Sequence, residues 1–453
     1  MGNACNNESV PREESMNAAT QPMALPPAGG GYFRWMQLAM GIACMAMIAN
    51  LQYGWTLFVD PIDAKYHWGR AAIQTAFTLF VVTETWLVPV EAWFVDKYGP
   101  RLVIMFGGVM IAIAWVINSQ ANSLVLLYSG AIVGGIGAGA VYGTCVGNAL
   151  KWFPDRRGLA AGATAAGFGA GAALTVVPIA SMIAKSGYEN AFLTFGIGQG
   201  VVVFILALFL RPPSVAMPAR KKQLNLPQTR LDFTPPQVLR TPIFWIMYVV
   251  FVMVASGGLM TAAQIGPIAH DFKIANEPVS LAGFQMAALT FAISLDRIFD
   301  GFGRPLFGWI SDHIGREHTM FIAFGTAAIM LLTLSAYGHI PIVFVLASAV
   351  YFGVFGEIYS LFPATSGDTF GIKFATTNNG MLYTAKGTAS LLVPLASIVS
   401  AAYGWQAVFV IAVLLNATAA LLALFVIKPV RRAFILGSQE VTSEATASDA
   451  RTA

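Results

Sequence analysis

The heptapeptide WISDHIG at residues 309–315 has a near copy, WFVDKYG, at residues 93–99. Each copy directly follows an apolar run, and the two occupy equivalent places in the first and second halves of the chain. The repeat therefore indicates that the two halves are related. Duplication of this kind is typical of membrane carriers whose substrate site lies near the bilayer midplane, between halves that rock against each other.

The composition around these copies is that of a membrane protein. Of the 453 residues, 57% are hydrophobic and only 11% are charged, whereas about 25% of the residues in soluble domains are charged. Apolar runs of about twenty residues, long enough to cross a hydrocarbon core of roughly 30 Å, recur along the chain. We predict twelve spans, at 36–58, 72–95, 102–119, 123–147, 158–182, 191–210, 243–265, 282–310, 320–337, 342–365, 380–402 and 405–428.

These spans predict an all-α polytopic membrane protein with twelve transmembrane helices in two pseudo-symmetric six-helix bundles. The expected organisation is a disordered N-terminal tail at 1–35, bundles at 36–210 and 243–428, a linker at 211–242 and a C-terminal tail at 429–453. Since the linker is strongly basic and basic loops stay on the cytoplasmic side of a membrane, we predict that the linker and both tails are cytoplasmic. The expected location is the inner membrane, where the protein would lie in the lipid bilayer as a monomer.

Other classes of protein fit the sequence poorly. The net charge of +4 is small and the basic residues lie in short loops, so we expect no nucleic-acid partner. The histidines fall in loops or at span ends, without the clusters of a membrane enzyme, and the cysteines lack metal-type spacing. No nucleotide-binding Gly-Lys-Ser/Thr loop is present. We therefore expect neither an enzyme nor a primary pump, and no metal or cofactor.

Among the cations inside predicted spans, the two most informative are Arg304 in the eighth and Lys386 in the eleventh. Each costs at least ~2.5 kcal/mol at a helix centre, so each needs a partner. A guanidinium binds one carboxylate through two parallel hydrogen bonds and an ammonium attracts another as a point charge, which suits a small dicarboxylate. The alternative is that protein acids neutralise both cations. Asp300 stands four residues before Arg304 on the same helix face, with Asp296 and Arg297 one turn earlier.

Aromatic and amide side chains recur in the same predicted spans. Aromatic edges are positive and phenols donate hydrogen bonds, so together they would line a pocket for an anion. For any single one of them, core packing or an interfacial position is the alternative. They are Gln52, Tyr53, Trp55, Gln74, Tyr142, Phe355 and Tyr359.

Glycine clusters in the fourth and fifth predicted spans, where small residues let helix backbones approach closely. We expect close packing at these positions rather than substrate contact, and a sliding seam between the helices. The residues are Gly134, Gly135, Gly137, Gly139, Gly143, Gly158, Gly162, Gly167, Gly169 and Gly171.

The repeated stretch resembles the signature of the major facilitator superfamily, G-x-x-x-D-x-x-G-R between the second and third spans of a half. The second copy matches it from Gly308 to Arg316, whereas the first has Ala92 in place of the first glycine and Pro100 inserted before the arginine. Such an aspartate can cap a neighbouring helix or pair with an arginine, a contact that breaks when the halves rock. We expect a gating role for Asp96, Arg101, Asp312 and Arg316.

Nearly the whole membrane region also resembles the oxalate/formate antiporter family. The likeness is carried by QYGWTL at 52–57, QTAFTL at 74–79, WFPDRRGLA at 152–160, Arg304 with Pro305, and AKGTAS at 385–390. It implies antiport of oxalate against formate by alternating access. The substrate-binding residues that it implies are Arg304, Lys386, Tyr53, Gln74, Tyr142 and Tyr359, with Phe355 and Tyr383 at two positions where the best-known member has tryptophan.

At three positions this chain has an acidic residue that the pattern of that family does not have. Asp296 and Asp300 stand at positions that are uncharged in the best-known member, and Glu357 adds an acid in the tenth span. Asp300 and Arg304 instead resemble the acid and arginine of proton-linked monocarboxylate transporters, a related branch. Symport of lactate-type substrates is therefore the alternative function, with Asp300 coupling protons or balancing charge.

The exchange hypothesis rests on the cost of unpaired charge. An empty carrier with two unpaired cations cannot easily close, since a buried unpaired charge costs several kcal/mol, and a bound anion removes that barrier.

Overall fold

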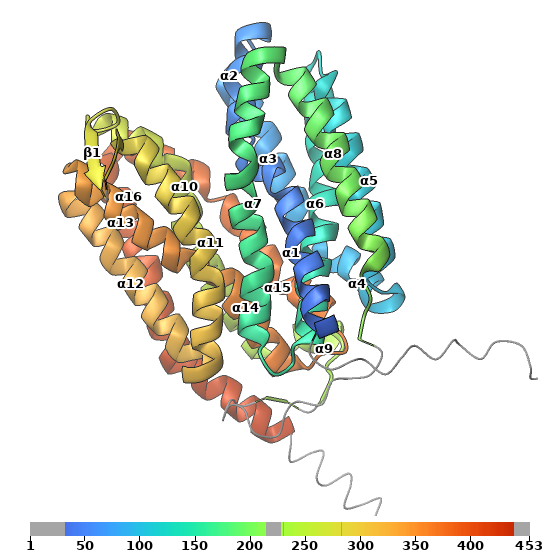
Figure 1. The fold of residues 1–453 in the computed structure, drawn as a ribbon. Coiled ribbons are helices and arrows are strands. Elements are labelled where there is room, and N and C mark those ends of the chain that lie inside the picture. Colours follow the sequence, from blue (N-terminus) through green and yellow to red (C-terminus); the bar gives the residue numbers. More distant parts are fainter. Residues whose placement is uncertain (1–31, 214–227, 230, 282, 439–453) are drawn as a thin grey trace, which may run out of the picture.

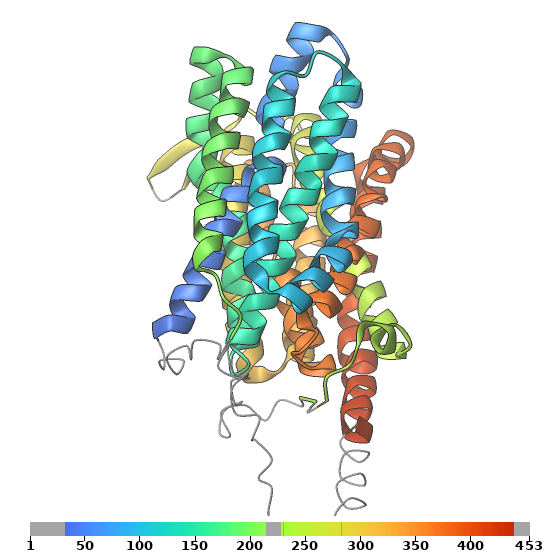
Figure 2. The ribbon, with the colours of Figure 1, turned by 90° about the vertical axis from the view of Figure 1, so that its right-hand side faces the viewer.

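The computed structural model describes residues 32–213, 228–229, 231–281 and 283–438. Most of this part of the chain is helical, and long helices run side by side through the molecule (Figures 1 and 2). The helices from α1 to α8 form one group and those from α10 onward form a second group. We name the end that carries α9 the base, and the end that carries α2 and the β-hairpin the top. The two groups meet toward the base and diverge toward the top (Figure 1).

Several helices of the first group begin directly after a residue that breaks a helix. Glycines with positive φ, Gly99 and Gly187, precede α5 and α8, and Pro100 opens α5. α3 and α4 follow each other through Leu87, and together they supply one apolar span over Thr75–Tyr98. The bounds are α1 Tyr32–Tyr53, α2 Thr56–Tyr66, α3 Arg70–Trp86, α4 Val88–Tyr98, α5 Pro100–Ser119, α6 Leu124–Trp152, α7 Arg157–Ser186 and α8 Tyr188–Phe209.

The second group has a similar pattern of breaks. α13 and α14 are interrupted at Gly356 but together form one apolar span, and α16 turns at Gly404, where φ is +77°. The bounds are α9 Pro235–Leu239, α10 Pro242–Asp271, β1 Pro278–Leu281, β2 Phe284–Ala287, α11 Ala288–Ile314, α12 Arg316–Tyr337, α13 Pro341–Phe355, α14 Ile358–Phe370, α15 Ala375–Ser390, α16 Val393–Leu422 and the π-helical turn η1 Ala423–Ile427.

Nine helices in the described part of the chain are long and apolar enough to cross a membrane. α7, α11 and α15 are not among these nine: α11 carries several charges, α15 has 16 residues, and the side chains of several residues of α7 lie outside the described part. These three helices lie where the groups meet, α7 against α11 and α15 against α3 and α4. Polar and small residues are tolerated there, since protein rather than lipid surrounds them. The count of twelve spans stays a prediction.

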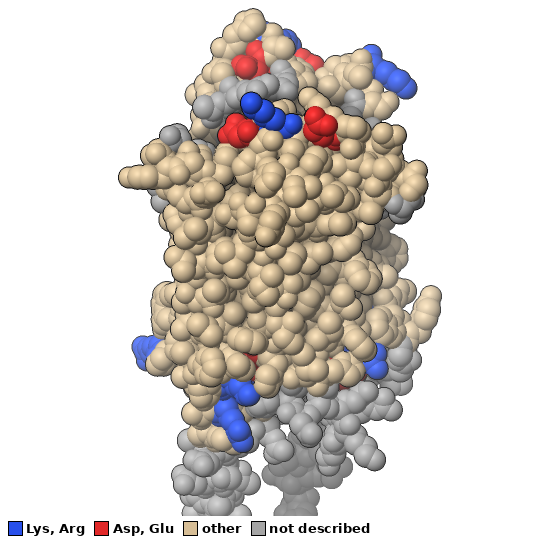
Figure 3. Space-filling model, turned by 90° about the vertical axis from the view of Figure 1, so that its left-hand side faces the viewer, with Lys and Arg blue, Asp and Glu red and all other residues tan. Residues whose placement is uncertain are grey.

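The outer surface agrees with a position across a membrane. On the face shown in Figure 3, lysine, arginine, aspartate and glutamate side chains gather toward the two ends, with a broad band of other residues between them. Large apolar side chains such as Phe106, Ile205 and Leu332 are about half exposed on the surface of the helices. Exposed apolar area on this scale is stable only in contact with lipid or another apolar surface.

Three details differ from the sequence-based expectations. A two-stranded antiparallel hairpin interrupts the all-helical pattern, because Pro278 begins an extended segment and Gly283, with φ of +83°, lies in its turn. α1 begins at Tyr32, inside the expected tail, whose residues 1–31 lie outside the described part. At the other end the helix continues past residue 428 to Ser438. There the buried Arg431 donates a hydrogen bond to Glu317 on α12, which holds the extension against the second group.

Candidate functional site

Arg304 lies in α11 with 1% of its surface exposed. Its Nη2 donates a hydrogen bond to Oδ2 of Asp300 at 2.7 Å, and its Nε approaches Oδ1 of the same carboxylate at 3.3 Å. The four-residue spacing places this acid one turn earlier on the same face of α11. Two further contacts reach the first group: Nη1 donates to the carbonyl of Ala165 on α7 at 2.9 Å, and Nη2 lies 3.4 Å from the hydroxyl of Tyr53 on α1.

Lys386 lies in α15 and is equally buried, with 2% exposed. Its Nζ is 3.1 and 3.3 Å from the two carboxylate oxygens of Glu84, which belongs to α3 in the first group. It also donates to Oε1 of Gln52 at 3.1 Å and to the hydroxyl of Tyr383 at 3.0 Å. Glu84 itself is completely buried. The ion pair between Lys386 and Glu84 therefore crosses the interface between the two groups.

A tyrosine ring connects the two cations. The guanidinium carbon of Arg304 lies 4.8 Å from the centroid of the Tyr359 ring, and Nζ of Lys386 lies 5.9 Å from the same centroid. Tyr142 and Tyr383 stack on each other at 4.5 Å, and both rings are within 6.0 Å of Nζ of Lys386. Cations placed over aromatic faces at these distances are attracted to them. The two cations predicted from sequence thus share one aromatic cluster.

The remaining predicted residues have different positions. The Phe355 ring lies 6.1 Å from that of Tyr359 and contributes to the outer part of the cluster. Gln74 belongs to α3, but its side chain lies outside the described part of the structure. Phe168, which the sequence did not suggest, packs edge-on against Tyr142 and lies 5.6 Å from Nζ of Lys386.

Sequence reasoning missed Glu84, and two signals were present. It is an acid inside an apolar run, the same signal that identified the cations. It also stands twelve residues before Asp96 of the first repeat, as Asp300 stands twelve residues before Asp312 of the second. With Glu84 and Asp300 in place, protein acids neutralise both cations. The premise of unpaired cations in the empty carrier therefore does not hold in this structure.

Two more acids lie buried in the second group. Glu357, fully buried at the break between α13 and α14, has no hydrogen-bond partner for either carboxylate oxygen among the described residues. Asp296 is 2% exposed, and its Oδ1 is also without a partner in that part of the chain. Buried polar groups normally have partners, so these two carboxylates are exceptions. Neither of them makes a hydrogen bond to Arg304 or Lys386 in the structure as described.

At the base, the signature aspartates join the two groups. Asp312, at the end of α11, accepts hydrogen bonds from the backbone N–H groups of Gly158 and Leu159, each at 3.0 Å. It also accepts one from Nη1 of Arg316 at 2.6 Å. Gly158 and Leu159 open α7, so a carboxylate of the second group caps a helix of the first group.

The first copy makes the reciprocal contact. Asp96, at the end of α4, accepts hydrogen bonds from the backbone N–H and the hydroxyl of Thr377, at 2.9 and 2.6 Å, in the first turn of α15. Its cationic partner is Lys151 at 2.6 Å. Arg101, which we expected in this role, is exposed: the inserted Pro100 makes it the second residue of α5, whereas Arg316 is the first residue of α12.

Asp368 in α14 adds a third contact at the base. It is fully buried and accepts hydrogen bonds from Nη1 of Arg157 at 2.6 Å, Nε of Arg316 at 2.8 Å and the side-chain amide of Gln228 at 2.9 Å. Arg157 belongs to the first group, so this ion pair also crosses the interface. The three aspartates together hold the groups in contact at the base.

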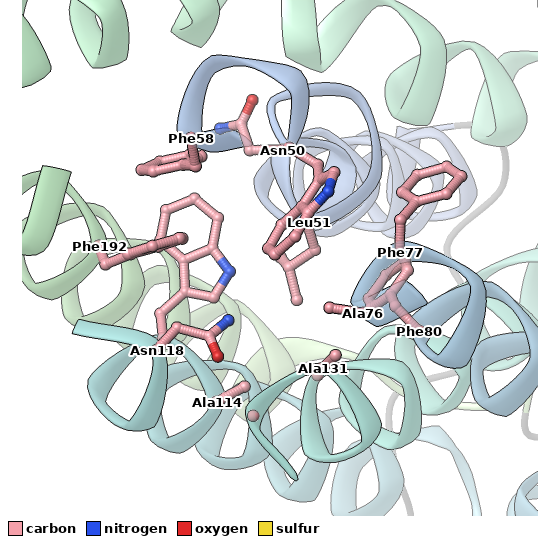
Figure 4. Close-up of a pocket in the computed structure, with 14 residues that line it drawn as sticks. Asn50, Leu51, Phe58, Ala76, Phe77, Phe80, Ala114, Asn118, Ala131 and Phe192 are labelled. Carbon is pink, nitrogen blue, oxygen red and sulfur yellow. The ribbon is translucent and has the colours of Figure 1, made fainter. Parts of the chain in front are cut away.

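A separate, narrow pocket lies inside the first group, away from these charges (Figure 4). Its walls are mainly apolar and aromatic, with Phe58, Phe80 and Phe192 among the labelled side chains and Asn118 at its edge. Trp55, one of the aromatic residues considered for an anion pocket, lines this pocket, but neither of the two cations does. We therefore place the candidate site at the charged cluster between the groups rather than at this pocket.

Two groups of helices that meet at one end and diverge at the other, with buried cations where they meet, are features of a secondary membrane carrier. The profile of the Major Facilitator Superfamily matches residues 38–300 and 280–450. The chain belongs to this superfamily, as the repeated signature predicted. It is a multi-pass membrane transporter.

Individual proteins show the same relation. The oxalate:formate antiporter of Oxalobacter formigenes is 35% identical over 415 residues, which cover 90% of this chain and 96% of that protein. Monocarboxylate transporter 11 of Mus musculus is 26% identical over 65% of this chain and 62% of its own length. Among solved structures, a proton:xylose symporter has a TM-score of 0.68 at 11% identity, over 87% of this chain and 96% of that one.

Proposed function

We propose that this carrier exchanges small carboxylates across the inner membrane, with oxalate and formate as the exchanged pair. The observation that carries the proposal is the pair of buried cations, Arg304 and Lys386, which share the Tyr359 ring where the two groups meet. An ammonium and a guanidinium are the side chains that bind carboxylates best. The likeness to an oxalate:formate antiporter over 90% of the chain supports the same substrates.

The proposed site uses the cluster around these cations. Tyr53, Tyr142, Tyr359 and Tyr383 would surround the bound anion, and their hydroxyls are donors for its remaining oxygens. Phe355 and Gln74 would complete the walls. In this proposal the contacts of Asp96, Asp312 and Asp368 close the base, and substrate enters from the top, where the two groups diverge.

The base is the proposed cytoplasmic side, with both termini on it. The support is the positive charge of the connections at that end: Lys97, Lys151 and Arg156 all lie close to the ends of helices there. The proposed location is therefore the inner membrane, with the central linker facing the cytoplasm.

Transport by purified protein in liposomes tests this function. We expect uptake of radiolabelled oxalate into liposomes loaded with formate or oxalate, well above that in protein-free liposomes. Lys386→Gln should abolish this uptake while the variant still inserts and elutes as a single peak in detergent. Failure of the native protein to exchange either carboxylate under these conditions would refute the proposal.

Proton-linked symport of a monocarboxylate is the second candidate, and the pair between Asp300 and Arg304 at 2.7 Å favours it. An acid that already neutralises the arginine can carry a proton when an anion takes its place. In that case lactate should enter empty liposomes when the outside is made acidic, and Asp300→Asn should remove the response to the pH gradient. Absence of lactate uptake under such a gradient excludes this candidate.

A further inference from the structure

The two buried cations, Arg304 and Lys386, pair with acids that lie in different places: one on the same helix and one in the other group. Asp300 and Arg304 lie one turn apart on α11, so this ion pair belongs to a single helix. Glu84 lies on α3 in the first group and Lys386 on α15 in the second, so this ion pair joins two helices of different groups. In alternating access, whole bundles move against each other while the helices within each bundle stay together.

The two pairs therefore respond differently to the transport movement. The pair within α11 persists whatever the position of the two groups. The contact between Glu84 and Lys386 depends on how closely α3 and α15 approach each other. Of the two cations, Lys386 is the one whose acid belongs to the other group and is separated from it by the movement itself.

We propose that Glu84 is an internal substitute for the substrate carboxylate at Lys386. In the empty carrier the Glu84 carboxylate forms an ion pair with the Lys386 ammonium group. An incoming substrate carboxylate displaces Glu84 from this ion pair. The proposal rests on the proposed function, because it assumes that the ligand of this site is a carboxylate. It adds a residue that neither the signature motif nor the predicted site contains.

The contacts of Lys386 fit such a replacement. Glu84 supplies both of its carboxylate oxygens to Nζ, at 3.1 and 3.3 Å, which is how a bound formate could also approach it. The other two partners, Gln52 and Tyr383, are neutral and remain available after the exchange. The exchange of one carboxylate for another therefore leaves the ammonium with one negative partner and two neutral ones, so it is not left alone in a buried site.

The balance of charge also points to the kind of ligand. Arg304, Lys386, Asp300 and Glu84 carry two positive and two negative charges when all are ionised. A monocarboxylate needs to displace only Glu84. A dicarboxylate that uses both cations has to displace Asp300 from Arg304 as well. Formate is thus the carboxylate that the site binds with the smaller rearrangement.

The consequence for transport is that the empty carrier can close. A buried lysine without a counter-ion opposes closure, and Glu84 removes this opposition without any substrate. The native protein should therefore carry net flux into liposomes that contain no exchangeable anion, in addition to exchange. A carrier without Glu84 should require substrate for each return step and work only by exchange.

Glu84→Gln tests the proposal in reconstituted liposomes, with the membrane potential clamped. Radiolabelled formate uptake is measured into empty liposomes, for net flux, and into formate-loaded liposomes, for exchange. We expect net flux to fall at least ~10-fold while exchange stays within about threefold of native, because in exchange the carrier closes only with a carboxylate bound at Lys386. Retained exchange also shows that the variant is folded.

Two further variants are the controls. Glu91→Gln makes the same change at an acid in the next helix whose buried carboxylate oxygens have no hydrogen-bond partner in the described residues, and both fluxes should stay native. Glu84→Asp keeps the charge on a shorter side chain and should restore part of the net flux.

The possible outcomes separate this inference from the proposed function. If native protein exchanges carboxylates but shows no net flux, the inference is wrong and the proposed function stands. The inference is also wrong if Glu84→Gln leaves net flux unchanged, or if it lowers net flux and exchange equally. If native protein transports no carboxylate at all, the proposed function itself has failed.

Discussion

Arg304 and Lys386 are both cations, but their surroundings demand different side chains. The Arg304 guanidinium donates hydrogen bonds in three directions, to Asp300, to the Ala165 carbonyl and toward the Tyr53 hydroxyl. Only a planar group with several fixed N–H donors can satisfy partners on three helices at once. Lys386 instead makes its contacts with Glu84, Gln52 and Tyr383 through one compact ammonium group.

Arg304→Lys should therefore impair transport although it keeps the charge. A lysine can reach Asp300 or Ala165 but not both, so the contact between α11 and α7 weakens. We expect the rate of carboxylate exchange in liposomes to fall by about tenfold or more, from the loss of one or two charged hydrogen bonds. Native exchange rates in this variant would show that only the charge matters.

Tyr383→Phe is a milder test at the same scale. It removes the hydroxyl that lies 3.0 Å from Nζ of Lys386 and keeps the ring that stacks on Tyr142. We expect the KM for formate to rise about fivefold with little change in maximal rate, as for loss of a single hydrogen bond worth about 1 kcal/mol.

Tyr351→Phe provides the matched control, since Tyr351 lies in α13 and makes no contact with Lys386. A lower maximal rate with unchanged KM in Tyr383→Phe would mean that the hydroxyl serves movement rather than binding.

At the scale of elements, the seam between α7 and α11 controls closure of the base. Gly158 on α7 and Gly308 on α11 face each other so closely that a Cβ on either would collide with the backbone carbonyl of the other. Small residues on both helices permit this approach. Gly158, at the start of the fifth predicted span, thus lies in the contact between the groups, and sliding along this contact stays a prediction.

Gly308→Leu should keep the two groups apart at the base. Spin labels at the exposed positions Lys97 and His313, one in each copy of the repeat, report the separation by pulsed electron paramagnetic resonance. We expect the distance distribution to shift to longer values in the variant. Gly325→Ala on α12, where an added Cβ meets open space, should leave it unchanged. Equal distributions in native protein and Gly308→Leu would contradict this role.

How much the sequence predicts depends on whether a contact is local. Arg304 with Asp300, and Arg316 with Asp312, are four residues apart and follow from helix geometry. Contacts between distant segments do not follow from spacing. Glu84 and Lys386 are separated by 302 residues, and Arg157 and Asp368 by 211. These two ion pairs can be identified only from the packing of α3 against α15 and of α7 against α14.

At the scale of the whole molecule, the charge of the loops predicts its orientation. A single cysteine at Ala64, exposed on α2 at the top, should react with a membrane-impermeant maleimide in intact cells. One at His313, exposed at the base, should react only after the membrane is permeabilised. The opposite pattern would place the base outside the cell and overturn the predicted orientation.

The crossed caps at the base have a consequence for the history of the chain. Asp96 of the first half caps α15 of the second, and Asp312 of the second half caps α7 of the first. If the halves descend from one shorter chain, the same two contacts would have joined two identical copies of that ancestor. The asymmetry between Arg304 and Lys386 then arose after the copies were fused, when each half became free to change without altering the other.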